Sequence, residues 1–312
     1  MQLAELLRDF QGLQNGPVPW SFVHDGGRHA RSVVVGSMVH GDETGSLPAL
    51  IRVARDLQEG RCSFGGRVAL FVGNPEAGLQ DARFLEADLN RVFVDSELTT
   101  HEHLRARELR VLLDGAEVFL DLHQTILPTQ RPFYIFPWSP EGAAWARAVG
   151  GADSWVSRAP GQSFSPGTCC ADEYVRDRGG VGFTLELGRR GLRADQDQRA
   201  EAAIRRVIEL NEALAGGASI EDLARQRPPL SLVRTVWMEP CLSRDQRLRP
   251  DLENFQPVRA GELLSAPGAP QLRAPVEGLL LFPKYPPRDR PLPGELVRIV
   301  QPLPQPPELL WG

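Results

Sequence analysis

The sequence predicts an α/β fold, in which helices flank a mostly parallel, mixed sheet, followed by a small all-β domain. Apolar strand patterns alternate with helical patterns through the first 228 residues, which indicates a layered sheet. Polar residues follow the ends of several predicted strands, where open α/β sheets bind ligands. Beyond residues 225–229 no convincing helix follows, and short strands alternate with Pro and Gly turns. We therefore expect a larger α/β domain over 1–228 and a β domain over 229–312.

The first elements follow from apolar periodicity. A short helix is expected over residues 2–10, and the apolar run Val33–Val35 predicts a buried strand that ends in a Gly-containing turn. A helix over 44–59 follows, because its apolar residues recur at helical spacing. The strand that begins at residue 67 runs into an Asn-Pro turn.

The remaining elements of the α/β domain are three strands and two helices. The strands are expected at 117–125, 134–138 and 180–188. The helices are expected at 101–113, where Thr100 is available as the cap, and at 195–215, which ends at Gly216-Gly217.

Length and composition limit the classes of protein that fit. The chain has 312 residues, of which 42% are hydrophobic and 24% charged. These values are ordinary for about two folded domains and exclude collagen, disorder throughout and a disulfide scaffold. The net charge of −5 argues against a general nucleic-acid binder. A local basic pocket for an acidic small molecule is compatible with that charge.

The sequence features that report on cellular compartment favour the cytoplasm. The amino terminus lacks the basic flank and apolar run of a signal peptide. No apolar stretch approaches the roughly 18 residues that a membrane helix needs. The four cysteines form no CxxC pair and are interpreted as reduced thiols. We expect a cytoplasmic protein without a membrane or nucleic-acid partner, and the sequence leaves its oligomeric state open.

The chain has six histidines, and two of them stand at strand ends with suitable neighbours. His40 and Glu43 are three residues apart directly after the first predicted strand, so they can face one ion. His123 stands at the end of another predicted strand. Two histidines and one carboxylate that leave a position for water are typical of a hydrolytic zinc site. Asp121, two residues before His123, either orients a ligand imidazole or serves another contact.

The other four histidines are interpreted as bystanders. His101 and His103 are two apart on a helix and therefore point to different faces, which suits solvated residues at a helix start. His24 and His29 are placed in a Gly-rich loop without a carboxylate at a telling spacing.

Glu186 lies within the apolar predicted strand at 180–188, where a carboxylate is costly unless it has a partner. One interpretation is an outward-facing strand position. The other is a general base beside the metal, because burial raises a carboxyl pKa and suits a group that takes a proton from water and passes it on.

The segment from Arg83 to Arg91 follows the second predicted strand, so it is expected on the same rim as the metal site. Arg91 with Asn90 is suited to grip a substrate carboxylate by paired hydrogen bonds. Arg83 is suited to polarise a scissile carbonyl and to hold the developing oxyanion. Each arginine taken singly is also compatible with a surface charge.

Five ordered motifs, HGDET, NPEA, RFLEADLNRVF, DLHQT and FTLELG, resemble the succinylglutamate desuccinylase/aspartoacylase family of zinc amidohydrolases, which is related to the zinc carboxypeptidases. The resemblance runs from residue 33 to 215 and continues through LENFQPVRAGELLSAPG and GLLLFPKYPP, so it covers most of the chain. DLHQTI, GQSFSPGT and LLLFPKY are more similar to the desuccinylase than to the aspartoacylase. The Pro-rich tail, Cys169-Cys170 and the first 30 residues depart from the family pattern.

The resemblance implies one zinc ion per chain, held by His40, Glu43 and His123, with Glu186 as the catalytic base. It assigns recognition of the substrate carbonyl and carboxylates to Arg83, Asn90 and Arg91. The resemblance also implies that residues 1–228 form a zinc-dependent catalytic domain with a zinc-carboxypeptidase-like fold.

Two further residues come from the resemblance alone. Family members place a substrate-binding arginine ten residues before the base, which is Arg176 in this sequence, and Arg178 in the same Arg-rich loop is the competing candidate. Tyr285 falls near a position where aspartoacylases use a tyrosine at the entrance of the site.

The function that the resemblance implies is hydrolysis of an N-acyl amino acid, first of all N-succinylglutamate to succinate and glutamate, at the end of an arginine-degrading succinyl route. One alternative is an aspartoacylase-like deacetylase or another N-acyl amino acid hydrolase. A second is a zinc carboxypeptidase, in which Asn90 and Arg91 hold a C-terminal carboxylate. A hypothesis from a different class is a non-catalytic carboxylate-binding protein that has kept the fold. The presence of the metal ligands together with Glu186 favours an enzyme.

Overall fold

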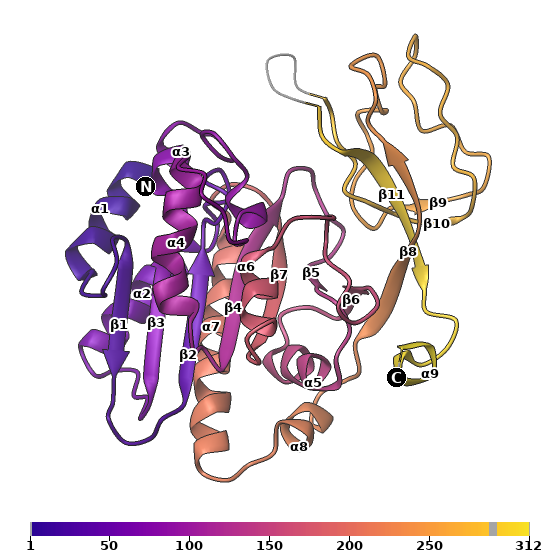
Figure 1. The fold of residues 1–312 in the computed structure, drawn as a ribbon. Helices are drawn as coiled ribbons and strands as arrows, with labels where there is room; N and C mark the ends of the chain where they lie inside the picture. The colour runs from indigo at the N-terminus through magenta and orange to yellow at the C-terminus, as the bar shows by residue number, and fades with distance from the viewer. Residues whose placement is uncertain (1, 287–291, 312) are drawn as a thin grey trace.

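The computed structural model describes residues 2–286 and 292–311, which fold into a large mixed sheet with helices on both faces (Figure 1). Within these residues eleven strands join in the order β1-β3-β2-β4-β7-β5-β6-β8-β11-β10-β9. The strands are β1 (Ser21–Asp25), β2 (Ser32–Ser37), β3 (Arg67–Val72), β4 (Val118–Thr125), β5 (Phe133–Ile135), β6 (Ser154–Ser157), β7 (Val181–Arg189), β8 (Ser231–Pro240), β9 (Pro257–Val258), β10 (Gly278–Leu281) and β11 (Glu295–Pro302). The helices are α1 (Leu3–Leu13), α2 (Leu47–Gln58), α3 (Pro75–Leu79), the 3-10 turn η1 (Leu89–Arg91), α4 (His101–Leu113), α5 (Pro140–Val149), α6 (Ala171–Arg176), α7 (Ala194–Ala215), α8 (Ile220–Arg225) and α9 (Pro307–Trp311).

Parallel pairing is concentrated at the middle of the sheet. β2 pairs in parallel with both β3 and β4, and β4 pairs in parallel with β7. The carboxyl ends of these four strands therefore meet at one edge. β1 and β5 run antiparallel to their neighbours β3 and β7, which makes the sheet mixed. The predicted mixed sheet flanked by helices is confirmed.

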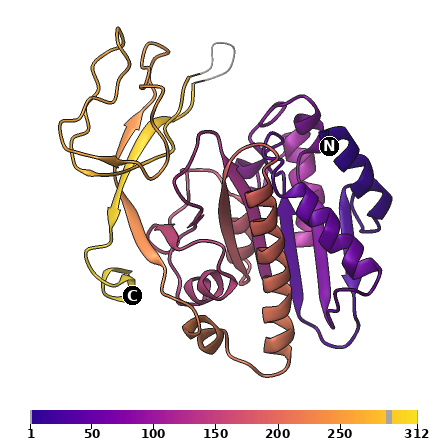
Figure 2. The same ribbon diagram turned by 180° about the vertical axis from the view of Figure 1, so that it is seen from behind.

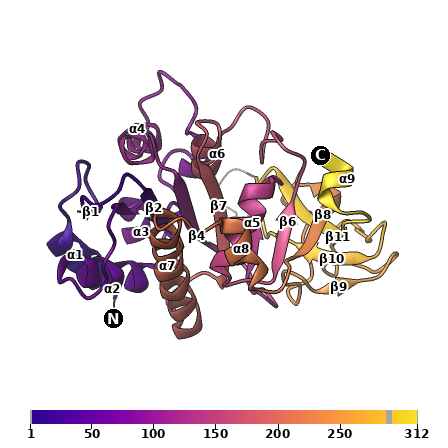
Figure 3. The same ribbon diagram turned by 90° about the horizontal axis from the view of Figure 1, so that it is seen from below.

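Helices cover both faces of these central strands (Figures 2 and 3). Val33 and Val35 pack into an apolar core that includes residues of α1, α2, α5 and α7. Val34, between them, packs on the opposite face with Phe119 and residues of α4 and α6. All three valines of β2 are fully buried, as expected for a parallel strand covered on both faces.

Successive side chains of a strand point to opposite faces of the sheet, and this alternation decides which side chains of β4 and β7 reach the candidate site. Leu120 and Leu122 belong to the first core, so Asp121 and His123 point to the opposite face. On β7, Phe183 and Leu185 belong to the first core, and Glu186 points with His123. The two strands are in register, with His123 opposite Glu186.

The C-terminal strands continue the main sheet. β8 pairs in parallel with β6 and antiparallel with β11, and the predicted boundary at residue 228 falls between α8 and β8. These strands have an apolar cluster of their own, which contains Leu280 and Val297. The short helix α9 follows the last strand, so the expectation of a purely β segment is wrong there. Its sequence Pro307–Trp311 begins with proline, a residue favoured at the first position of a helix.

Among residues 2–286 and 292–311, no helix combines the length and the apolar character needed to cross a bilayer. The four cysteines are free thiols, of which Cys170 and Cys241 are buried.

Candidate active site

The turn after β2 brings His40 and Glu43 together. Gly41 is required in this turn, because an added Cβ would lie 2.3 Å from the backbone nitrogen of Gly78. The His40 Nδ1 and Glu43 Oε1 atoms lie 2.8 Å apart, and both side chains are buried. The spacing of three residues therefore does aim both groups at one point.

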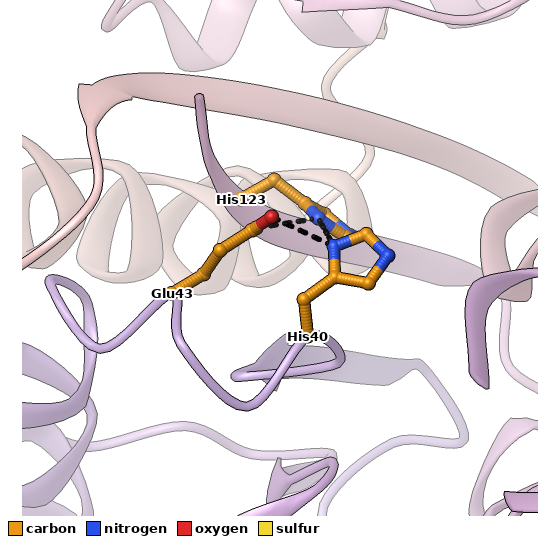
Figure 4. Close-up of side chains that lie close together, drawn as sticks. All are labelled: His40, Glu43 and His123. Carbon is orange, nitrogen blue, oxygen red and sulfur yellow. Dashed lines mark hydrogen bonds and ion pairs between the residues drawn. The ribbon is translucent and has the colours of Figure 1, made fainter. Parts of the chain in front are cut away.

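His123, at the C-terminal end of β4, completes the cluster (Figure 4). Its Nδ1 lies 2.9 Å from Glu43 Oε2 and 3.1 Å from His40 Nδ1. The ligand atoms of the three residues all lie within 4.8 Å of one another. In the part of the chain that the structure describes, this is the one such group that could hold a metal ion.

A further carboxylate holds the far nitrogen of each imidazole. Asp121 Oδ2 lies 2.8 Å from His123 Nε2, and Asp88 Oδ1 lies 3.1 Å from His40 Nε2. Carboxylates in this position fix the rings and leave Nδ1 free to bind a cation. The two Nδ1 atoms are 3.1 Å apart. Two nitrogens bound to one zinc at tetrahedral angles are about 3.3 Å apart, so the donor set and its spacing fit zinc.

Burial and charge oppose each other in this cluster. Burial acts to raise the pKa of Glu43, but the neighbouring His40 and His123 outweigh it and hold that pKa well below its ordinary value. Burial acts to lower the pKa of His123, but Asp121 and Glu43 outweigh it and hold that pKa well above its ordinary value. The cluster therefore keeps its carboxylate ionised and favours positive charge between the rings.

Glu186 lies on β7 beside His123. Its side chain is buried, and its Oε2 atom has no hydrogen-bond partner among the described residues. Burial, followed by the negative charge of Glu43, raises the pKa of Glu186 to about 7. The interpretation of Glu186 as an outward-facing, solvated strand residue is therefore wrong. A buried carboxyl group with a raised pKa next to a candidate metal site has the environment of a proton-transfer group.

Arg83 and Asn90 reach the cluster from the segment after α3. Arg83 donates from Nη1 to Glu43 Oε1 at 3.1 Å and from Nε to Asp88 Oδ2 at 3.2 Å. The Asn90 Nδ2 atom lies 3.4 Å from His123 Nε2. The structure therefore places both residues against the predicted metal ligands, so the interpretation of Arg83 as a plain surface charge is wrong.

Arg91 and Arg176 lie farther out in this network. Arg91 donates to the backbone oxygen of Asn90, and its guanidinium lies 4.6 Å from the centre of the Phe164 ring. Arg176 donates to Asp172 Oδ2 at 2.7 Å. Neither arginine contacts the three metal ligands among the described residues. Arg178, the competing candidate, pairs with Asp114 at 3.5 Å and stacks on Tyr174, on the side of α4.

Tyr285 is engaged elsewhere in the C-terminal region. Its hydroxyl group donates to the backbone oxygen of Arg249, and the residue is 37% exposed. Within the described residues it contacts none of the side chains of the metal cluster. The structure therefore gives no support to the role at the site entrance that the resemblance suggested.

Two of the bystander histidines are placed differently from the sequence expectation. His24 lies within β1, not in a loop, and its Nε2 is 3.1 Å from the Phe64 backbone oxygen. His103 is buried, not solvated, and its Nδ1 is 2.7 Å from the hydroxyl group of Thr100. Each of these two rings therefore has a hydrogen-bond partner within the fold, from the segment before β3 for His24 and from the helix cap for His103.

Sequence reasoning missed Glu102, in the first turn of α4, and Asp88. Glu102 is fully buried, and its two carboxylate oxygens accept four hydrogen bonds. The donors are Asn74 Nδ2 and the backbone N–H groups of Leu85, Glu86 and Ala87, at 2.7–3.1 Å. Glu102 thus anchors the segment that carries Arg83 and Asn90. An acidic residue in a first helical turn was visible in the sequence, but it also suits the helix dipole, so it did not single out this contact.

We expect Glu102→Ala to lower the free energy of unfolding by about 3 kcal/mol, because three backbone N–H groups lose their buried acceptor. Activity should fall as well, since the segment with Arg83 and Asn90 loses its anchor. Denaturant titration of the purified chain measures the first effect. Glu97→Ala, at an exposed carboxylate just before α4, is the matched control and should change stability by less than about 0.5 kcal/mol. Equal stability of the two variants would contradict the anchoring role.

Comparisons with known proteins identify the family and the fold of this chain. A family model described as succinylglutamate desuccinylase/aspartoacylase catalytic domain matches residues 29–210. A succinylglutamate desuccinylase of Pseudomonas fluorescens is 30% identical over 248 residues, which cover 73% of this chain and 70% of that protein. A succinylglutamate desuccinylase of Pseudomonas paraeruginosa is 31% identical over 251 residues, which cover 73% of this chain and 71% of that protein. The crystal structure of succinylglutamate desuccinylase from Chromobacterium violaceum superposes with a TM-score of 0.70 at 23% identity and covers 96% of this chain and 98% of that chain.

Proposed function

The chain belongs to the succinylglutamate desuccinylase/aspartoacylase family, and from this premise we propose that it hydrolyses the amide bond of an N-acyl amino acid, with N-succinylglutamate as the leading substrate. The observation that carries the proposal is the position of Glu186, a buried carboxyl group beside a cluster that fits zinc. A carrier protein would bind a carboxylate without needing a buried carboxyl group whose pKa is raised to about 7.

We propose that His40, Glu43 and His123 hold one zinc ion, which when bound supplies Lewis-acid polarisation and favours ionisation of water. Glu186 takes the proton from the attacking water and returns it to the departing amine nitrogen. Arg83 donates N–H groups toward the carbonyl oxygen, where negative charge develops. The carboxylates of the substrate are bound by Asn90, Arg91 and Arg176.

This reaction would release succinate and glutamate, as in the last step of an arginine-degrading succinyl route, and we propose the cytoplasm as its compartment. We assign the catalytic residues to the unit that ends near residue 228. The strands beyond it supply none of the residues named in the reaction so far.

Two assays on the metal-loaded chain test the proposal and separate the alternatives. The first measures glutamate released from N-succinylglutamate, and the second measures acetate released from N-acetylaspartate. We expect the first reaction to be faster. Turnover of N-acetylaspartate alone would favour the deacetylase, and turnover of short peptides alone would favour the carboxypeptidase. No turnover of any of these would leave the non-catalytic hypothesis.

The pH profile of kcat/KM is a further expected outcome. Glu186 must be ionised to accept a proton, and its pKa is raised from 4.5 to about 7 by burial and by Glu43. A cation bound at Glu43 would offset that negative charge and lower the pKa of Glu186, while burial would keep it above 4.5. We therefore expect kcat/KM to fall about tenfold per pH unit below an apparent pKa between these two values. A profile that stays flat down to about pH 4 would contradict Glu186 as the base.

A further inference from the structure

One aromatic ring gathers guanidinium groups from three parts of the chain. Phe164 lies in the loop between β6 and α6. The guanidinium carbon of Arg91 lies 4.6 Å from the ring centre, that of Arg298 lies 4.8 Å away, and that of Arg158 lies 5.7 Å away. Arg298 belongs to β11, so this ring joins the C-terminal strands to the segment that carries Asn90 and Arg91.

Positive charge exceeds negative charge around this ring. Arg158 pairs with Glu173 at 2.6 Å. Arg298 pairs with Glu295 at 2.5 Å, and Lys284 pairs with the same carboxylate at 2.8 Å. Arg91 has no carboxylate within ion-pair distance in the described part of the chain. Direct ion pairs therefore give the cations Arg91, Arg158, Arg298 and Lys284 only the carboxylates Glu173 and Glu295. Asp172 also acts on Arg158 and Asp88 on Arg91, but these two carboxylates are themselves paired with Arg176 and Arg83.

This surplus is partly withdrawn from water. The side chains of Arg158 and Arg298 are each 15% exposed. Unbalanced positive charge in such a position is unfavourable unless an anion joins it. The chain as a whole carries a net charge of −5, so its overall composition does not account for a local excess of cations.

The guanidinium groups are held in a way that leaves them able to bind an anion. A guanidinium that lies over an aromatic ring keeps its N–H groups in the guanidinium plane available for a carboxylate. The Phe164 backbone N–H donates to Glu173 Oε1 at 2.7 Å, the same oxygen that pairs with Arg158. Glu173 therefore fixes both the loop and one of the cations.

The basic cluster also borders the metal centre. Arg91 follows Asn90, whose amide lies 3.4 Å from His123 Nε2. In the C-terminal region, burial lowers the pKa of Lys284, Glu295 opposes this effect, and the cations Arg83 and Arg298 add smaller lowering contributions. Arg83 itself bonds Glu43. Lys284, between β10 and β11, is therefore within the electrostatic reach of Arg83 at the metal site.

We propose that Arg298 and Phe164 are specificity-determining residues, which form with Arg91 a subsite for a substrate carboxylate remote from the scissile amide. This inference rests on the proposed function and adds to it. It gives the C-terminal strands a part in selecting the substrate, through Arg298 and not through Tyr285. Substrates with several carboxylates then gain binding energy that substrates with a single carboxylate do not.

The test uses the full metal-loaded chain with Arg298→Gln, and Arg259→Gln at an exposed position of the same region as the matched control. We expect Arg298→Gln to raise the KM for N-succinylglutamate at least tenfold with little change in kcat. Calorimetry with succinate should show a similar loss of affinity, while acetate binding stays the same. The control should match the unchanged chain in each measurement.

Phe164 is tested by a pair of variants. Phe164→Leu removes the ring and should raise KM, whereas Phe164→Tyr keeps the ring and should leave KM unchanged. A general loss of structure would instead lower thermal stability and kcat together. A wild-type KM in Phe164→Leu would overturn the part assigned to the ring.

The outcomes separate this inference from the proposed function. If the chain hydrolyses N-succinylglutamate but Arg298→Gln leaves both KM and succinate affinity unchanged, the subsite is wrong and the function stands. If the chain hydrolyses no N-acyl amino acid but Arg298→Gln weakens succinate binding, the subsite stands and the function is wrong.

Discussion

Glu186→Gln is expected to lower kcat by roughly 10²- to 10⁴-fold, the usual contribution of a general acid–base group, while metal content stays the same. Glutamine has nearly the same size as glutamate but accepts no proton from water at neutral pH. The side chain lies outside the cluster of His40, Glu43 and His123, so its replacement leaves all three metal ligands in place. Steady-state assays with N-succinylglutamate and elemental analysis of the same preparation measure the two effects.

Two matched variants show whether the kcat lost in Glu186→Gln is due to the missing carboxylate at this position. Glu186→Asp keeps a carboxylate but withdraws it by one methylene, so it should retain part of the activity that Glu186→Gln loses. Glu97→Gln changes the same functional group at an exposed position and should leave kcat unchanged. If Glu186→Gln kept a kcat within about threefold of the unchanged chain, the proton-transfer role would belong to another group.

The central elements of the fold could be predicted because their signals are local. The apolar run at Val33–Val35 marks β2, and the helical spacing after it marks α2. Thr100 caps α4 as expected, since its side chain accepts a hydrogen bond from the backbone N–H of His103. The long helix α7 ends at Gly216, as the Gly-Gly pair indicated. Each of these features depends on residues within a few positions of one another.

Several elements were missed because they are short or because proline obscures them. The strands β1 and β6 have five and four residues, too few to show a clear alternation. Helix α5 begins at Pro140 with Ser139 as its cap, and this Ser-Pro signal is obscured by the apolar run at 134–138 directly before it. The pairing of β8 with β6, which continues the main sheet past residue 228, depends on contacts between distant segments that no local pattern encodes.

The candidate site likewise contains residues that local patterns predict and contacts that depend on distant segments. His40 and His123 could be predicted as neighbours, because each follows or ends one of two strands that pair in parallel. The hydrogen bonds of Asp88 and Glu102 depend on how the segment after α3 folds back over the sheet. The cations around Phe164 come from β11 as well as from segments before residue 228, so sequence spacing does not indicate them.

His123→Ala is expected to abolish stable metal binding and, with it, nearly all turnover. Removal of one of three protein ligands leaves His40 and Glu43, too few for a stable tetrahedral zinc site. His123→Ala also removes the imidazole that contacts Asp121, so this fully buried carboxylate loses its partner in the metal-free protein as well. We expect the metal-free variant to be about 3 kcal/mol less stable than the metal-free parent chain. Metal-to-protein ratios after dialysis, with denaturant titration of both metal-free proteins, measure these effects.

Asp121→Asn separates the ligand role from the supporting role. It keeps all three ligands but replaces the carboxylate that lies 2.8 Å from His123 Nε2. Loss of such a partner should weaken metal affinity by roughly 10- to 100-fold, without abolishing binding. His101→Ala, at a partly exposed histidine on α4, should bind metal like the unchanged chain. Metal affinity should be highest in His101→Ala, lower in Asp121→Asn and lowest in His123→Ala. Full zinc occupancy in His123→Ala would refute the ligand set.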